Sequence, residues 1–113
     1  MENCLFCNIL KGEIPCSKVY ENDHVFAFRD INPQAPVHVL VIPKKHLSSL
    51  NDIDNADDKD LAECLRTIRY IAAQEKLSGG YRVVSNCGAD ACQSVHHLHF
   101  HILGGSKMEE RMG

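Results

Sequence analysis

The sequence contains no tryptophan, and aromatic residues make up only 6% of it. No apolar run approaches the roughly 18 residues that a membrane-spanning helix needs. The first residues, Met1-Glu2-Asn3-Cys4, include no basic segment followed by a long apolar stretch, so we see no sign of a signal peptide. These absences argue against a membrane protein and predict a cytoplasmic one.

An excess of positive charge is also absent. The chain has 12 lysines and arginines against 15 aspartates and glutamates, which gives a net charge of −3. Binding to the backbone of a nucleic acid polymer depends on a basic surface, so we expect no such partner. A small anionic ligand would have to be held by local groups, such as histidines and backbone amides.

The length of 113 residues suits a single domain over residues 1–113, with a flexible polar tail over 106–113. Clusters of β-branched and aliphatic residues between turn signals predict two strands on either side of the polar segment 21–23, and further strands over 37–42, 81–85 and 95–103. With a short N-terminal helix over 5–10 and one long helix, the pattern predicts an α+β fold. We expect a mainly antiparallel five-stranded sheet covered on one face.

The long helix is the clearest element of the sequence. Apolar residues recur three and four positions apart from 61 to 72 and form one stripe. Aspartates at 57, 58 and 60 favour its N-terminus through the helix dipole. We expect the helix to stop at Ser78-Gly79-Gly80.

Three histidines alternate with apolar residues in the run His97-Leu98-His99-Phe100-His101. Successive side chains of a strand point to opposite faces, so the three imidazoles are predicted to share one face. Leu98, Phe100 and Ile102 would then pack on the long helix. A solvated face, a metal site and nucleophilic catalysis are all compatible with this alternation.

The loop before these histidines suits a phosphate better than a bare cation. Residues 86–94 are mostly small or turn-forming, and the backbone amides of such a loop can approach an anion closely. Asn86, Gln93 and Ser94 add neutral hydrogen-bond donors. A hairpin loop without any ligand has a similar composition, so the indication comes from the loop together with the histidines.

Six cysteines would suggest a disulfide framework only in a secreted protein, for which the sequence gives no sign. We therefore interpret Cys4 and Cys7 as metal or redox residues, although a Cys-x-x-Cys pair alone is a weak signal. The other four cysteines are interpreted as small apolar residues.

Residues 93–105, Gln-Ser-Val-His-His-Leu-His-Phe-His-Ile-Leu-Gly-Gly, resemble the signature of the histidine triad superfamily. Further matches to its nucleoside phosphoramidate hydrolase branch cover nearly the whole chain, in the segments 4–7, 12–15, 30–36 and 41–46. The resemblance implies the fold of that superfamily. It also implies a hydrolase that acts on purine nucleoside phosphoramidates or acyl-nucleotides and releases the nucleoside monophosphate.

By this resemblance, His99 is the nucleophile, which would attack the α-phosphorus and form a nucleotidyl-histidine intermediate. His101 and Ser94 would donate hydrogen bonds or a proton to the phosphate and the leaving group. His38 would support the triad from a neighbouring strand.

The resemblance also implies a nucleotide site. Asp30 would accept hydrogen bonds from the ribose, and Ile31 would lie against the sugar or base, whereas without the resemblance Asp30 is an ordinary turn residue. The phosphate would contact His99, His101, Asn86, Cys92, Gln93 and Ser94. Cys92 stands where relatives commonly have glycine, so a positive φ there would strain the backbone.

Four residues are implied as ligands of a structural zinc ion, namely Cys4, Cys7, His46 and His97. Two thiolates and two imidazoles are a usual donor set for a closed tetrahedral site. The ion would tie the N-terminus to the sheet and orient the catalytic segment from behind.

Two other functions stay open at this level. A dinucleoside polyphosphate hydrolase would share the nucleophile, and a nucleotide-binding regulatory module would bind with little turnover. The resemblance further implies a homodimer with the long helix at its interface, although the tail lacks the tryptophan common in this branch.

Overall fold

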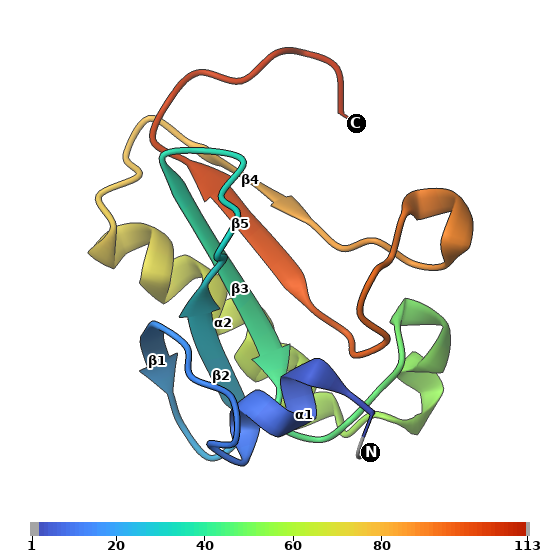
Figure 1. The fold of residues 1–113 in the computed structure, drawn as a ribbon. Helices are drawn as coiled ribbons and strands as arrows, with labels where there is room; N and C mark the ends of the chain where they lie inside the picture. Colours follow the sequence, from blue (N-terminus) through green and yellow to red (C-terminus); the bar gives the residue numbers. More distant parts are fainter. Residues whose placement is uncertain (1–2, 113) are drawn as a thin grey trace.

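The computed structural model describes residues 3–112 (Figure 1). Its elements in chain order are α1 (Leu5–Leu10), β1 (Lys18–Glu21), β2 (Val25–Arg29), β3 (Val37–Pro43), the 3-10 helix η1 (Leu50–Asn55), α2 (Asp58–Gln74), β4 (Tyr81–Val84), the 3-10 helix η2 (Ala89–Ala91) and β5 (Phe100–Gly104). Within the described residues, no helix is long and apolar enough to cross a membrane.

The five strands form one sheet in the order β1-β2-β3-β5-β4, and every neighbouring pair is antiparallel. The predicted α+β fold with an antiparallel five-stranded sheet is confirmed. β3 and β5 lie side by side at the centre, with His101 opposite Leu40 and Ile102 opposite Val39. Directly opposite residues point to the same face, so His101 shares its face with Leu40.

Both faces of the sheet carry apolar side chains, as the alternation along β2 and β3 requires. One face packs against α2 and includes Val25, Ala27, Val39, Val41 and Ile102. Phe100 also packs there, as expected. The other face is not bare, because Phe6 and Ile9 of α1 pack there against β2 and β3. The short helix α1 therefore covers the face that carries His101 (Figure 1).

Helix α2 starts as predicted and ends earlier than predicted. Asp57 caps its N-terminus by accepting a hydrogen bond from the amide of Lys59. The predicted stop at residues 78–80 is wrong, because the helix ends at Gln74. Lys76 takes a left-handed φ of 59°, and the amide of buried Leu77 donates to the carbonyl of Ala72 at 3.0 Å. This Schellman motif ends the helix without glycine.

The last strand is shorter than the sequence predicted. A strand over 95–103 is wrong, because β5 begins only at Phe100. The pairing of β5 with β3 begins at Phe100, opposite Val41, although β3 continues to Pro43, so residues 95–99 do not join the ladder. They are held instead by local bonds, such as the one from the amide of Leu98 to the carbonyl of Leu47 at 2.6 Å.

Candidate functional site

Four imidazoles lie close together on the face of the sheet that α1 covers. His38 comes from β3 and His101 from β5, while His97 and His99 come from the segment before β5. His38, His97 and His99 are buried. The ring of Phe6 meets the rings of both His97 and His99 edge-on. The predicted common side of the three alternating histidines therefore holds, although two of them precede the strand.

A backbone carbonyl determines where His99 carries its proton. Nδ1 of His99 lies 2.6 Å from the carbonyl oxygen of His97, so Nδ1–H is the donor. A neutral imidazole has a single N–H, so Nε2 of His99 is bare. Burial lowers the pKa of His99, which favours this neutral form.

His38 and His101 form a second defined pair. The amide of Gln34 donates to Nδ1 of His38 at 3.0 Å, which places the His38 proton on Nε2. Nε2 of His38 lies 2.8 Å from Nδ1 of His101 and donates to it. His101 must then carry its own proton on Nε2. Burial lowers the pKa of both rings, that of His101 to about 4, and the neighbouring histidines add to the effect on His101.

His97, the first of the three alternating histidines, has the opposite tautomer to that of His99. Nε2–H of His97 donates to the carbonyl of Pro43 at 2.9 Å, so its bare nitrogen is Nδ1. That nitrogen lies 3.5 Å from the sulfur of Cys4 and 3.5 Å from that of Cys7. Nδ1 of His46 lies 3.2 Å from the same Cys7 sulfur.

These four groups suit a divalent metal ion. One ligand atom of each of Cys4, Cys7, His46 and His97 lies within 4.8 Å of all the others. Tetrahedral zinc with bonds of about 2.3 Å to sulfur and about 2.0 Å to nitrogen places those atoms roughly 3.5 Å apart. Burial raises the pKa of the Cys7 thiol to about 11, and a bound dication would offset this shift by stabilising the thiolate. The chemistry and spacing of the donors therefore fit zinc.

A second cluster of Asp30, His38 and His101 is less suited to a metal, although its ligand atoms also lie within 4.8 Å of one another. The amide of Gln34 occupies Nδ1 of His38, so Nε2 carries a proton and donates to His101. A metal at Nε2 would have to displace that proton to Nδ1, where it would oppose the Gln34 amide.

A cavity of about 230 Å³ opens in front of His99 and His101. Its inner wall is apolar and includes Phe6 and Ile9 of α1 with Phe28 and Leu40 of the sheet. Four of the polar residues predicted for the site line it, namely Asp30, Ser94, His99 and His101, and Ile31 lies there almost fully exposed. The cavity thus joins an apolar compartment to a polar wall of imidazoles.

The loop before the histidines is shaped by positive φ angles. Gly88 has a φ of 86°, and Cys92 has a φ of 60°, in the left-handed region that favours glycine. The strain expected for a cysteine at this position is therefore present. Asn86 and Cys92 are not among the residues that line the 230 Å³ cavity, and their contact with phosphate stays a prediction. The side chain of Gln93 turns inward and binds protein groups instead.

Sequence reasoning missed the groups that orient the rings. The carbonyls of Pro43 and His97 and the amide of Gln34 belong to the backbone, which has no residue-specific signal. The hydroxyl of Ser85 donates to the carbonyl of His99 at 2.8 Å. His24 and His96 belong to neither the cavity in front of His99 nor the cysteine and histidine cluster, since His24 pairs with Asp60 and His96 is exposed.

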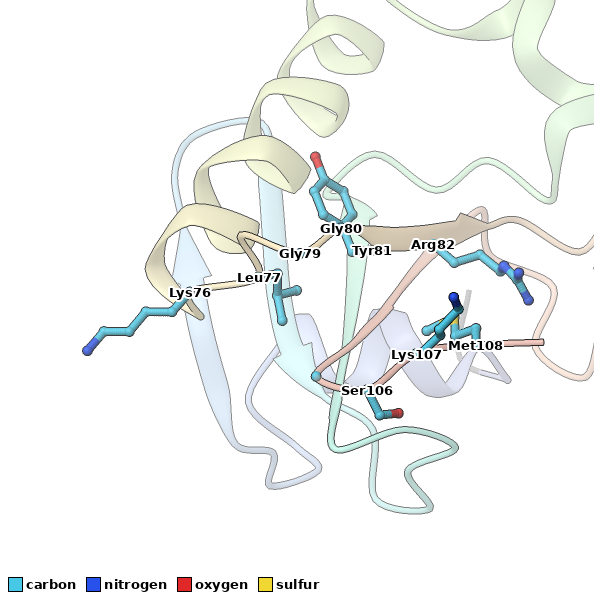
Figure 2. Close-up of a pocket in the computed structure, with 10 residues that line it drawn as sticks. Lys76, Leu77, Gly79, Gly80, Tyr81, Arg82, Ser106, Lys107 and Met108 are labelled. Atoms are coloured by element: carbon cyan, nitrogen blue, oxygen red, sulfur yellow. The ribbon is translucent and has the colours of Figure 1, made fainter. Parts of the chain in front are cut away.

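A larger cavity, of about 670 Å³, lies between the α2–β4 turn and residues 105–108 (Figure 2). Its lining includes no histidine, cysteine or carboxylate. Lys76 points away from it, and the guanidinium of Arg82 donates to the carbonyls of Glu109 and Arg111 at 2.8 and 3.0 Å. This cavity therefore has none of the imidazoles, thiols or carboxylates that the cavity in front of His99 or the Cys4, Cys7, His46 and His97 cluster provides. Flexibility of the tail 106–113 stays a prediction, and Gly113 lies outside the described residues.

Comparisons by sequence and by structure found known proteins that are similar to this chain. A 14 kDa zinc-binding protein from Zea mays is 48% identical over 106 residues, which are 92% of this chain and 83% of the maize protein. A HIT family hydrolase from Clostridium thermocellum superposes with a TM-score of 0.95 at 42% identity, covering 99% of this chain and 98% of that one.

A histidine triad protein from Clostridium difficile superposes with a TM-score of 0.90 at 47% identity, over 98% of this chain and 97% of that one. The HIT domain family itself matches residues 11–108, which include all three alternating histidines. The sequence match and the shared fold agree, and the chain belongs to the HIT domain family.

Proposed function

We propose that this chain is a nucleotide hydrolase that acts on purine nucleoside phosphoramidates or acyl-nucleotides and uses Nε2 of His99 as its nucleophile. One observation carries the proposal. A bare ring nitrogen of His99 stands at the wall of a cavity, beside a second ring, His101, whose Nε2 carries a proton. Such a pair supplies a nucleophile and a hydrogen-bond donor without any change of tautomer.

The reaction would proceed in two displacements. Nε2 of His99 attacks the α-phosphorus, a P–N(histidine) bond forms, and the bond from phosphorus to the leaving amine breaks. As it departs, the amine takes a proton from solvent by way of the Ser94 hydroxyl, while Nε2–H of the neutral His101 ring donates a hydrogen bond to the phosphate. Water then attacks the same phosphorus, the P–N(histidine) bond breaks, and the nucleoside monophosphate leaves while the water proton returns to solvent.

The cavity supports a nucleotide as the substrate. Its apolar side chains suit a base, and Asp30 lines the same cavity as His99 and His101. Oδ1 of Asp30 accepts from the amide of Asn32 and Oδ2 lies 3.5 Å from Nε2 of His38, and each oxygen keeps a further lone pair that can accept from a ribose hydroxyl. The volume of 230 Å³ is small for a ligand pocket, so the phosphate would remain at the histidine wall.

We also infer that Cys4, Cys7, His46 and His97 hold a structural zinc ion. When bound, the ion would neutralise the two thiolates and lock the four side chains together. All four donors come from the protein, which is the composition of a closed site. His97 would then be held at both ring nitrogens, with its carbonyl oxygen directed at Nδ1 of His99.

Exposed apolar side chains on α2 and on the edge strand β4 support a homodimer. Leu65 and Tyr70 on α2 are 60% and 50% exposed, and Tyr81 and Val83 on β4 are 41% and 42% exposed. An edge strand with exposed apolar residues is normally covered in a stable protein.

The first prediction concerns the nucleophile. With adenosine 5′-phosphoramidate as substrate, His99→Ala should lower AMP release by on the order of a thousandfold or more, because the covalent intermediate cannot form. His96→Ala removes an exposed neighbouring histidine and should retain the parent rate. Equal turnover by His99→Ala and the parent would refute the mechanism. A parent that binds AMP but releases none from the substrate would favour a binding module or a dinucleoside polyphosphate hydrolase.

The second prediction concerns the metal. The parent should contain one zinc ion per chain by elemental analysis, and Cys7→Ser should lose most of it. The loss should lower the melting temperature by more than about 5 °C, because metal binding contributes to folding. Cys92→Ser, at an exposed cysteine outside the cluster, should keep its zinc. Full zinc content in Cys7→Ser would contradict the assignment.

The third prediction concerns assembly. In sedimentation equilibrium the parent should behave as two chains of 12.7 kDa each. Leu65→Glu places a charge among the exposed apolar side chains and should shift the equilibrium to monomer. A parent that sediments as a monomer at all concentrations would rule out the dimer.

The fourth prediction concerns pH. The pKa of His101 is about 4 in the folded chain against an ordinary 6.5, owing to burial and to His99 and His38, while Asp30 opposes the shift. Between these values the unfolded chain binds a proton that the folded chain does not, so stability falls as pH falls from 6.5 to 4. His101→Gln should remove up to about 3 kcal/mol of that decline in the free energy of unfolding. Denaturant titrations at each pH should give a flatter curve for His101→Gln, and parallel curves would show that His101 does not contribute.

A further inference from the structure

The side chain of Gln93 is buried and makes three hydrogen bonds to protein groups. Its Oε1 accepts from the amide of Gly88 at 2.9 Å. Its Nε2 donates to the carbonyl of Ser48 at 2.7 Å and to the carbonyl of Val95 at 3.0 Å. Both N–H groups of the side-chain amide are therefore hydrogen-bonded to protein carbonyls, and none is left to donate to a phosphate.

These three bonds join three separate segments of the chain. Gly88 begins the loop 88–93. The backbone N–H of Gln93 donates to the carbonyl of Gly88 at 3.1 Å, so the two ends of the loop are also bonded to each other. Ser48 follows β3 and lies two residues after His46. Val95 lies two residues before His97. The side-chain amide of Gln93 thus bonds the loop to two segments, Ser48 and Val95, each of which lies two residues from a histidine of the cysteine and histidine cluster.

Only a primary amide can make this set of bonds. The position needs one acceptor and two donors on a flat group, whereas an ionised carboxylate has acceptors only and an ammonium has donors only. The loop 88–93 that Gln93 holds also has a strained backbone, since Cys92 has a φ of 60°. Such a loop conformation persists only when surrounding bonds maintain it.

We propose that Gln93 is a positioning residue, whose side-chain amide fixes the loop 88–93 and Ser94 relative to His99. It acts through the loop and does not touch the substrate. The proposal rests on the proposed function for its catalytic consequence, because the backbone amides of this loop would stabilise charge on phosphorus. It replaces the direct phosphate contact by the Gln93 side chain that the sequence implied.

Two substitutions separate this role from a general structural one. Gln93→Met keeps the length of the side chain and removes all three bonds at every pH. Gln93→Glu keeps the acceptor for Gly88, but at high pH its carboxylate faces the carbonyl oxygens of Ser48 and Val95. When protonated, the introduced carboxyl regains one O–H donor.

The expected result is a fall in kcat for AMP release of roughly 10- to 100-fold in both variants at pH 8, with KM changed less than kcat. As pH falls towards 6, the kcat of Gln93→Glu should rise relative to that of Gln93→Met, because the introduced carboxyl can be protonated and the methionine side chain cannot. The native titratable groups of the segments that Gln93 joins are common to both variants. They are His46 before Ser48, Asp52 bonded to Ser48, Cys87 bonded to Ser49, Asp90 in the loop and His97 after Val95. The ratio of the two rates therefore isolates the introduced group.

Two results would overturn the proposal. One is a kcat within twofold of the parent in both variants. The other is a raised KM with an unchanged kcat, which would mean that Gln93 contacts the substrate. If the parent itself shows no turnover, the proposed function fails, and hydrogen exchange of the Gly88 amide tests the positioning role alone. That amide should exchange at least tenfold faster in Gln93→Met than in the parent, and equal exchange would overturn the role.

Discussion

The proton positions on four packed imidazoles depend on three backbone groups, and the rest of the site follows from them. A neutral imidazole has one N–H and one bare nitrogen, so a single hydrogen bond determines what the other nitrogen can do. The carbonyls of Pro43 and His97 accept hydrogen bonds from the N–H groups of His97 and His99, respectively. The backbone amide of Gln34 donates to Nδ1 of His38. As a result one bare nitrogen faces two sulfurs, another faces the cavity, and His101 is left with an N–H.

His97 connects two chemical environments. Its ring points to the sulfurs of Cys4 and Cys7, while its carbonyl oxygen accepts from Nδ1 of His99 at 2.6 Å. Any displacement of the Cys4, Cys7, His46 and His97 cluster would therefore move the group that fixes the His99 tautomer. Through this direct link, the proposed zinc ion would influence the proposed chemistry of His99 without lying in the cavity.

The apolar framework could largely be predicted from the sequence, because periodicity reports local geometry. The stripe from 61 to 72 corresponds to the face of α2 that packs on the sheet, and the β-branched run over 37–42 corresponds to β3. The sheet was expected to be covered on one face, whereas Phe6 and Ile9 of α1 also cover the other. The errors lie where a tertiary contact replaces a local signal. Helix α2 ends at Gln74 without glycine, because Lys76 takes a left-handed φ and buried Leu77 completes the Schellman motif. Strand β5 starts late because the amide of Leu98 bonds to the carbonyl of Leu47 and not to β3.

The sequence by itself determined which residue types are available, namely alternating histidines, a paired set of cysteines and a loop of small residues before them. It also indicated the family through their spacing. Tertiary structure alone decided what each does, because the partners of an imidazole or an amide are backbone groups distant in sequence. Gln93 shows this most clearly. Its side chain would suit a phosphate contact, but the carbonyls of Ser48 and Val95 occupy both of its donors.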